Sequence, residues 1–174
     1  EGRSVGVYLG HLGNWEWITS LPYWTQNATC CQLYHPLENE YFDRLFRYVR
    51  ERNGAYCIPM QESLRKILEF KKANKPVIVG YISDQTPFWW NIHHWLTFLN
   101  HDTPVLTGAE RIVKHTDQVF VYGDMKRVKR GHYNCEFKVL REDTKQAKPF
   151  EITDEYFRNM EPVSYTHLRA HETV

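Results

Sequence analysis

The chain has 174 residues, of which 42% are hydrophobic and 25% are charged, and its formal net charge is +1. This composition is that of a globular domain, so it excludes a disordered chain, and the small net charge excludes a large basic field that would bind nucleic acid. The four cysteines include no C-x-x-C pair, which argues against a disulfide framework or a zinc knuckle. No stretch approaches the roughly 20 apolar residues that a membrane-spanning helix needs.

Strands and helices alternate along the chain. Short apolar runs predict buried strands, and apolar residues at spacings of three and four predict helices. The predicted strands are 5–9, 30–34, 55–58, 77–82, 119–126 and 133–140. The predicted helices begin near Trp15 and then cover 38–52, 63–73, 108–115 and 153–160, the last with Thr153 as its N-cap. This alternation predicts an α/β fold in which helices pack on a sheet.

The segment 10–16 reads Gly-His-Leu-Gly-Asn-Trp-Glu and joins the first predicted strand to the first predicted helix. We expect the turn to bring His11 and Glu16 together, although they are five residues apart. A Glu in the first turn of a helix stays ionised, so it would hold the imidazole in one tautomer. The other ring nitrogen would then take a proton from a substrate hydroxyl that attacks an activated acyl group. Gly10 and Gly13 would let a substrate approach the backbone closely.

Taken alone, an H-x-x-x-x-E spacing is more simply explained by a strand end followed by a helix start. Further motifs change this interpretation, because they follow in a fixed order: YHPLEN at 34–39, RERNG at 50–54, SDQ at 83–85 and TGAER at 107–111. Together with the first motif they resemble the bacterial lipid A biosynthesis acyltransferases, the late acyltransferases of the lysophospholipid acyltransferase superfamily. The resemblance covers about residues 5–162, and it departs from the family at His35, where an Arg is more common.

The resemblance implies a glycerolipid acyltransferase-like α/β fold with a mixed sheet flanked by helices. It implies an O-acyltransferase of lipopolysaccharide biosynthesis, which moves a fatty acyl chain from acyl carrier protein or acyl-CoA to a hydroxyl of a lipid A precursor. The implied location is the cytoplasmic face of the cell inner membrane. The implied partners are acyl carrier protein, the lipid acceptor and the membrane surface, with no nucleic acid, no cofactor and no metal.

Residue by residue, the resemblance makes His11 the catalytic base and Glu16 its partner acid. The residues that it suggests for substrate binding are Asn14, Arg52, Asp84 and Gln85. A structural role stays open for three of these, since Asn14 could shape the turn, Arg52 could pair with Glu51 and Asp84 could cap a loop. Asp84 and Gln85 follow a buried strand, where open α/β sheets usually bind ligands.

Two other segments suit a lipid or an acidic partner. Pro-Phe-Trp-Trp at 87–90 suits an acyl-chain groove or a lipid interface, although ordinary loop packing explains any single Trp slightly better. The basic turn at 126–131 suits acidic head groups or an acidic carrier protein, although most such turns are simply solvated. His93 and His94 lack a third ligand at a suitable spacing, so we expect no metal there.

We expect one domain, 1–162, as a fragment that lacks an N-terminal anchor region. It would be inactive in isolation if the usual ending of the family helps to close the site. The stretch 163–174 has no apolar period and is expected to be a non-native tail, so His167 and His171 are left out of any site. Three rival functions stay open. They are a superfamily acyltransferase that acts on a glycerolipid or an amino-acid lipid, a metal-dependent hydrolase, and a non-catalytic lipid-binding domain.

Overall fold

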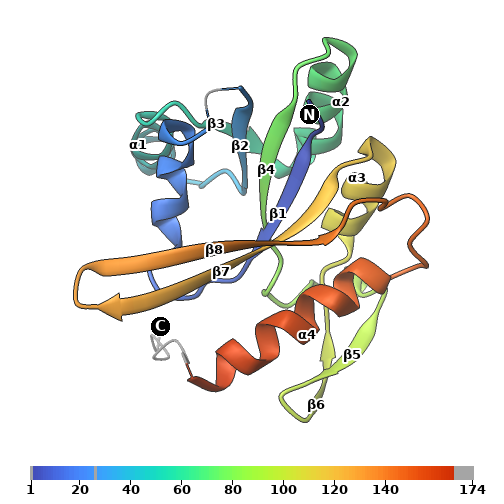
Figure 1. The fold of residues 1–174 in the computed structure, drawn as a ribbon. Helices are drawn as coiled ribbons and strands as arrows, with labels where there is room; N and C mark the ends of the chain where they lie inside the picture. Colours follow the sequence, from blue (N-terminus) through green and yellow to red (C-terminus); the bar gives the residue numbers. More distant parts are fainter. Residues whose placement is uncertain (1, 26, 167–174) are drawn as a thin grey trace.

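The computed structural model describes residues 2–25 and 27–166, and a six-stranded sheet forms its centre (Figure 1). The sheet order is β3-β2-β4-β1-β7-β8. Its strands are β1 (Val5–Leu9), β2 (Thr29–Tyr34), β3 (Tyr56–Pro59), β4 (Val77–Ile82), β7 (Val119–Lys129) and β8 (His132–Arg141). All neighbours pair in parallel except β7 and β8, which form an antiparallel hairpin at one edge. The predicted α/β fold with a mixed sheet and flanking helices is therefore confirmed.

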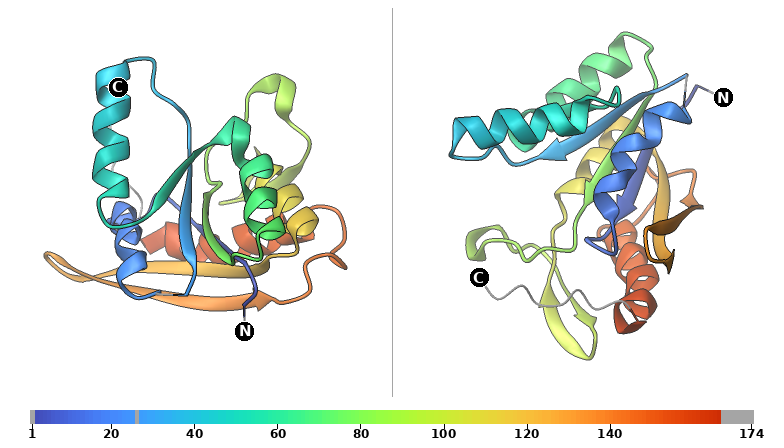
Figure 2. Two further views of the ribbon diagram at one scale, coloured as in Figure 1. Left: turned by 90° about the horizontal axis from the view of Figure 1, so that it is seen from above. Right: turned by 90° about the vertical axis from the view of Figure 1, so that its left-hand side faces the viewer.

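Helices cover both faces of the sheet, which explains why β1 and β4 are apolar nearly throughout. The larger core packs one face against α2 (Ser63–Lys72), α3 (Gly108–Thr116) and α4 (Glu151–Thr166). A smaller core packs the other face against the 3-10 helix η1 (Trp15–Tyr23). Figure 2 shows these helices lying on both sides of the strands. The alternation within β1 follows from this arrangement, because Tyr8 faces the larger core while Val7 and Leu9 face the smaller one.

The remaining elements lie outside the central layers. They are α1 (Glu40–Glu51), the short 3-10 helices η2 (Met60–Glu62) and η3 (Trp89–Asn91), and a separate hairpin of β5 (Trp95–Phe98) and β6 (His101–Pro104). This hairpin was not expected, because its strands are only four residues long and carry no strict alternation. Its turn uses positive φ angles at Leu99 and Asn100, and Asn tolerates this conformation better than most residues do.

Helix α1 leaves its apolar stripe in solvent. Asn39 caps the helix through its side chain, which accepts hydrogen bonds from the backbone N–H groups of Tyr41 and Phe42. None of the helix residues is buried, and the exposed apolar side chains are Tyr41, Phe42, Leu45, Phe46, Tyr48 and Val49. An amphipathic helix normally turns such a stripe toward the core, so this surface is open to a partner.

Helix α4 differs from the prediction at both ends. It begins at Glu151, two residues before the expected N-cap, so the N-cap prediction for Thr153 is wrong. At the other end it continues through Val163, which packs against the core, and the buried Ser164 hydroxyl donates to the carbonyl of Met160. Residues 167–174, with His167 and His171, lie outside the described residues, and the non-native origin of the tail stays a prediction.

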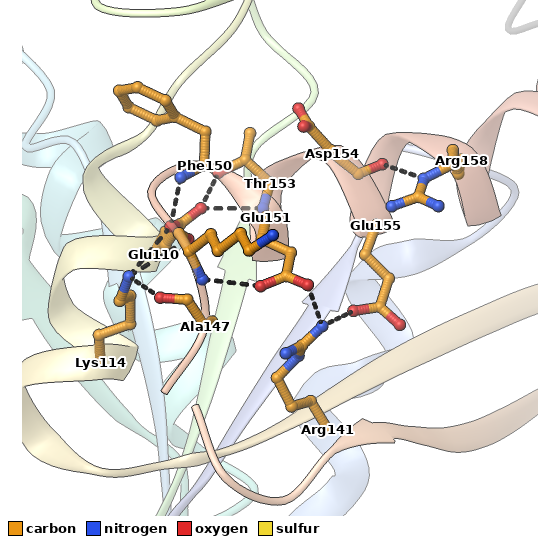
Figure 3. Close-up of polar contacts among 11 residues, drawn as sticks. Glu110, Lys114, Arg141, Ala147, Phe150, Glu151, Thr153, Asp154, Glu155 and Arg158 are labelled. Carbon is orange, nitrogen blue, oxygen red and sulfur yellow. Dashed lines mark hydrogen bonds and ion pairs between the residues drawn. The ribbon is translucent and has the colours of Figure 1, made fainter. Parts of the chain in front are cut away.

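Glu110 of α3 caps the N-terminus of α4, which was the function expected of Thr153 (Figure 3). One carboxylate oxygen accepts from the backbone N–H of Phe150 at 2.8 Å. The other accepts from the backbone N–H of Thr153 at 3.0 Å and from its hydroxyl at 2.7 Å. Lys114 lies 3.8 Å from the same carboxylate. A buried side chain from another helix therefore satisfies donors that helix α4 cannot pair internally.

Replacing Glu110 with alanine should destabilise the fold by about 2–4 kcal/mol, because it leaves three donors around Phe150 and Thr153 without an acceptor. The free energy of unfolding, measured by urea titration, checks this. The matched control is Glu69→Ala on α2, which removes only exposed ion pairs to Arg65 and Lys66 and should change stability little. Equal effects of the two substitutions would contradict the capping role of Glu110.

No helix within the described residues is long and apolar enough to span a bilayer.

Candidate active site

The candidate site lies where β1 and β4 end. The two strands run in parallel and in register, with Leu9 opposite Ile82 as the last pair. His11 and Asp84 each lie two residues beyond that pair, so the register brings them to the same edge of the sheet. The chain leaving β1 continues to β2 on one side, while the chain leaving β4 continues to α3 and β7 on the other. Open α/β sheets form a crevice at such a switch point.

Asp84 holds His11 through two contacts. The ring Nδ1 of His11 lies 2.6 Å from Oδ1 of Asp84, and the backbone N–H of His11 donates to Oδ2 at 2.7 Å. Both side chains are largely buried, with 20% and 16% of their surfaces exposed. A carboxylate can only accept, so Nδ1 carries the proton and Nε2 is the nitrogen left to act as a base. The ring also meets Trp15 edge-on, at 4.9 Å between centroids.

Glu16 lies elsewhere than the sequence suggested. Its carboxylate receives two hydrogen bonds from the guanidinium of Arg50, Nη2 to Oε1 at 2.7 Å and Nε to Oε2 at 3.3 Å. The hydrogen bond from Arg50 to Glu16 also raises the pKa of Arg50. This two-pronged pair ties the start of η1 to the end of α1. The structure therefore assigns the contact with the imidazole to Asp84, and the contact with α1 to Glu16.

The other predicted site residues are more dispersed. Asn14 precedes η1, and its carbonyl accepts a hydrogen bond from the backbone of Trp17, so its visible role is in the turn. Arg52 is the exposed C-cap residue of α1. Gln85 is exposed directly after Asp84. The structure thus brings His11 and Asp84 together, and it leaves Arg52 and Gln85 open to solvent.

Arg50 is the residue in this region that sequence reasoning missed. It stands in the same motif as Arg52, but its side chain is only 20% exposed where it pairs with Glu16. No periodicity distinguishes the two arginines, because the apolar stripe of α1 does not face the core. Only the packing of η1 beside α1 shows which arginine turns inward.

Gly10 and Gly13 are needed for the conformation and close packing of the backbone. Gly13 has a φ of +57°, which few other residues adopt without strain. A Cβ at Gly10 would lie 3.0 Å from Sδ of Met160 and 3.2 Å from Oδ2 of Asp84. Met160 of α4 and the carboxylate of Asp84 therefore occupy the space beside Gly10, and no room is left there for a substrate.

Gly10→Ala should push on Asp84 and Met160 and thereby loosen the contact between His11 and Asp84. We expect a loss of about 1–3 kcal/mol in stability, typical of overpacking, together with a clear loss of turnover. Thermal unfolding and initial rates check the two effects. Gly80→Ala is the control, since its Cβ would make only an ordinary 3.8 Å contact with the carbonyl of Cys31. Wild-type turnover in Gly10→Ala would show that the close packing is unimportant.

A cavity of about 510 Å³ includes Ser83, the residue before Asp84, among its lining residues, whereas His11 and Asp84 do not line it. Its walls come from β2, α2, α3 and the end of β4, and they are mainly apolar, including Leu33, Leu64, Leu106 and Ile112. Arg111 and His115 of α3 also line it. This combination of apolar walls and a few polar groups suits a ligand with a hydrocarbon part.

The histidines at 93 and 94 have other contacts. His94 Nε2 lies 2.7 Å from Oδ1 of Asp154, and its ring stacks on Phe150, while His93 lies 3.2 Å from the side-chain oxygen of Asn91. Within residues 2–25 and 27–166, no group of three or more His, Cys, Asp or Glu side chains could hold a metal ion.

The family model described as bacterial lipid A biosynthesis acyltransferase matches residues 1–162, which is most of the chain. A comparison with curated protein sequences gave no significant match. Members of this family are acyltransferases that act on a lipid acceptor. The chain therefore belongs to the bacterial lipid A biosynthesis acyltransferase family.

Proposed function

We propose that the chain transfers a fatty acyl group to a hydroxyl of a lipid A precursor, with His11 as the general base. The observation that carries this proposal is the pair of contacts between His11 and Asp84, which place the proton of a neutral imidazole on Nδ1 and leave Nε2 as the nitrogen that can accept a proton. Nε2 takes the proton of the acceptor hydroxyl as its oxygen attacks the carbonyl carbon of an acyl thioester. A C–O bond forms, the C–S bond breaks, and the leaving thiolate takes the proton back from His11.

Asp84 has two functions in this proposal. It fixes the tautomer and the orientation of the imidazole, and its negative charge stabilises the imidazolium that forms when the proton arrives. Glu16 acts indirectly, because its ion pair with Arg50 holds η1 in place. Trp15 at the start of η1 is thereby kept beside the His11 ring.

The cavity beside Ser83 is our candidate for the acyl chain. Its apolar walls would take a hydrocarbon chain, and Ser83, which precedes Asp84, is one of its lining residues. We propose that an acyl group bound there presents its thioester carbon to His11. We infer that acyl carrier protein is the donor. The basic turn between β7 and β8, exposed from Lys126 to Gly131, is the surface that would meet this acidic protein.

Because the acceptor is a lipid, we propose that the reaction takes place at a membrane surface, on the cytoplasmic face of the inner membrane. The apolar stripe of α1 and the exposed side chains of Phe88, Trp89 and Trp90 would contact the lipid interface, where aromatic side chains are favoured. Sedimentation with anionic lipid vesicles tests this contact. Phe42→Ser and Leu45→Ser together should weaken binding severalfold without unfolding the domain, because neither side chain is buried.

The decisive test of the reaction is mass spectrometry of lipid A from a strain that lacks its own late acyltransferases and expresses this protein. We expect a new species that is heavier by one fatty acyl group. The control strain expresses a His11→Ala version at the same level. An unchanged lipid A, with new acylated glycerolipid or amino-acid lipid in the same extract, would show that the acceptor is a different lipid.

A further inference from the structure

A buried hydroxyl of α4 holds the end of the strand that leads to His11. Tyr156, in the second turn of α4, is fully buried and donates a hydrogen bond to the carbonyl of Leu9 at 3.0 Å.

This contact lies where the pairing of the sheet stops. Leu9 and Ile82 are the last paired residues of β1 and β4. The Tyr156 hydroxyl therefore holds β1 at its last pair with β4. His11 lies two residues after Leu9, and Asp84 lies two residues after Ile82. A shift of either chain would change the 2.6 Å contact between the two side chains.

Tyr156 is itself held rigidly. Its ring packs against Tyr8, Tyr122 and Phe157, with centroids 5.5, 6.2 and 5.0 Å away. Burial raises the pKa of Tyr156 well above its usual value, so the hydroxyl keeps its proton and stays a donor. The helix that carries it is anchored at its N-terminus by Glu110, as Figure 3 shows.

We propose that Tyr156 is a positioning residue for acyl transfer, because its hydroxyl fixes the end of β1 and thereby the contact between His11 and Asp84. This inference rests on the proposed role of His11 as the base. The proposal gives helix α4 a function in catalysis. This helix follows all six strands of the sheet in sequence and packs against the larger core.

Tyr156→Phe tests the proposal, because it removes one oxygen atom and keeps the ring. We expect kcat to fall about tenfold, the scale of one lost hydrogen bond, with the KM for the donor and for the acceptor changed by less than about twofold. Because a looser contact with Asp84 stabilises the protonated imidazole less, the acid limb of the kcat–pH profile should move to lower pH.

The matched control is Tyr8→Phe. Tyr8 belongs to the same aromatic cluster and is equally buried, but its hydroxyl has no hydrogen-bond partner among the described residues. It should keep the wild-type rate and pH profile. Fluorotyrosine at position 156 is the second variant, since it retains the hydroxyl and should keep turnover within about threefold of wild type.

The outcomes separate this inference from the proposed function. A wild-type kcat and pH profile in Tyr156→Phe would overturn the positioning role while leaving the base intact. An equal loss in the fluorotyrosine variant, or a failure of both variants to fold, would overturn it as well, because ring packing would then be the only function. Full activity of His11→Ala would instead overturn the proposed function itself.

Discussion

Replacing His11 with alanine is expected to reduce acyl transfer by about 10²–10⁴-fold, the usual contribution of a general base. Without the imidazole, no group at the end of β1 takes the proton from the acceptor hydroxyl. The fold should survive, because the backbone N–H of His11 still donates to Asp84 and the ring is partly exposed. Initial rates with purified enzyme, together with the thermal unfolding midpoint, measure the two effects separately.

His93→Ala is the control for this substitution. His93 is exposed and its ring lies 3.2 Å from the side-chain oxygen of Asn91, so neither rate nor stability should change appreciably. If His11→Ala keeps more than about a third of the wild-type rate, which is less than 1 kcal/mol of transition-state stabilisation, His11 is not the base.

Asp84→Asn is expected to cost about 10²–10⁴-fold in kcat, on the scale seen when the orienting acid of a catalytic triad becomes an amide. Asp84 accepts two hydrogen bonds from His11, one from the backbone and one from the ring. Asparagine offers only one acceptor, so its amide group must face either the backbone N–H or Nδ1. The first arrangement is repulsive, and the second selects the wrong tautomer of the imidazole.

The effect of Glu16→Gln is to be compared with that of Asp84→Asn. A glutamine still accepts one of the hydrogen bonds from Arg50, so we expect a smaller loss of kcat than in Asp84→Asn. The ¹⁵N chemical shifts of the His11 ring should report a changed tautomer in Asp84→Asn and an unchanged one in Glu16→Gln. The reverse pattern would show that Glu16, the partner suggested by the sequence, orients the base.

Local sequence patterns predicted the elements well wherever apolar periodicity was strong. The run Val77–Ile82 is apolar on both sides because β4 lies between two parallel neighbours and under helices. The hairpin of β5 and β6 was missed because its short strands carry no such period. The start of α4 was misjudged because its donors are satisfied by Glu110, a side chain about 40 residues earlier, and not by a local cap.

The sequence alone was enough to predict an α/β fold, to place His11 at the end of a strand and, through five motifs in order, to suggest the family. It could not identify the partner of His11. Asp84 is 73 residues away, and no spacing rule links the two, since their meeting depends on which strand pairs with β1 and in what register. The same is true of the contact between Arg50 and Glu16 and of the contact between Tyr156 and Leu9. The tertiary structure decided these contacts, because each one joins elements whose separation in sequence carries no information about their distance in space.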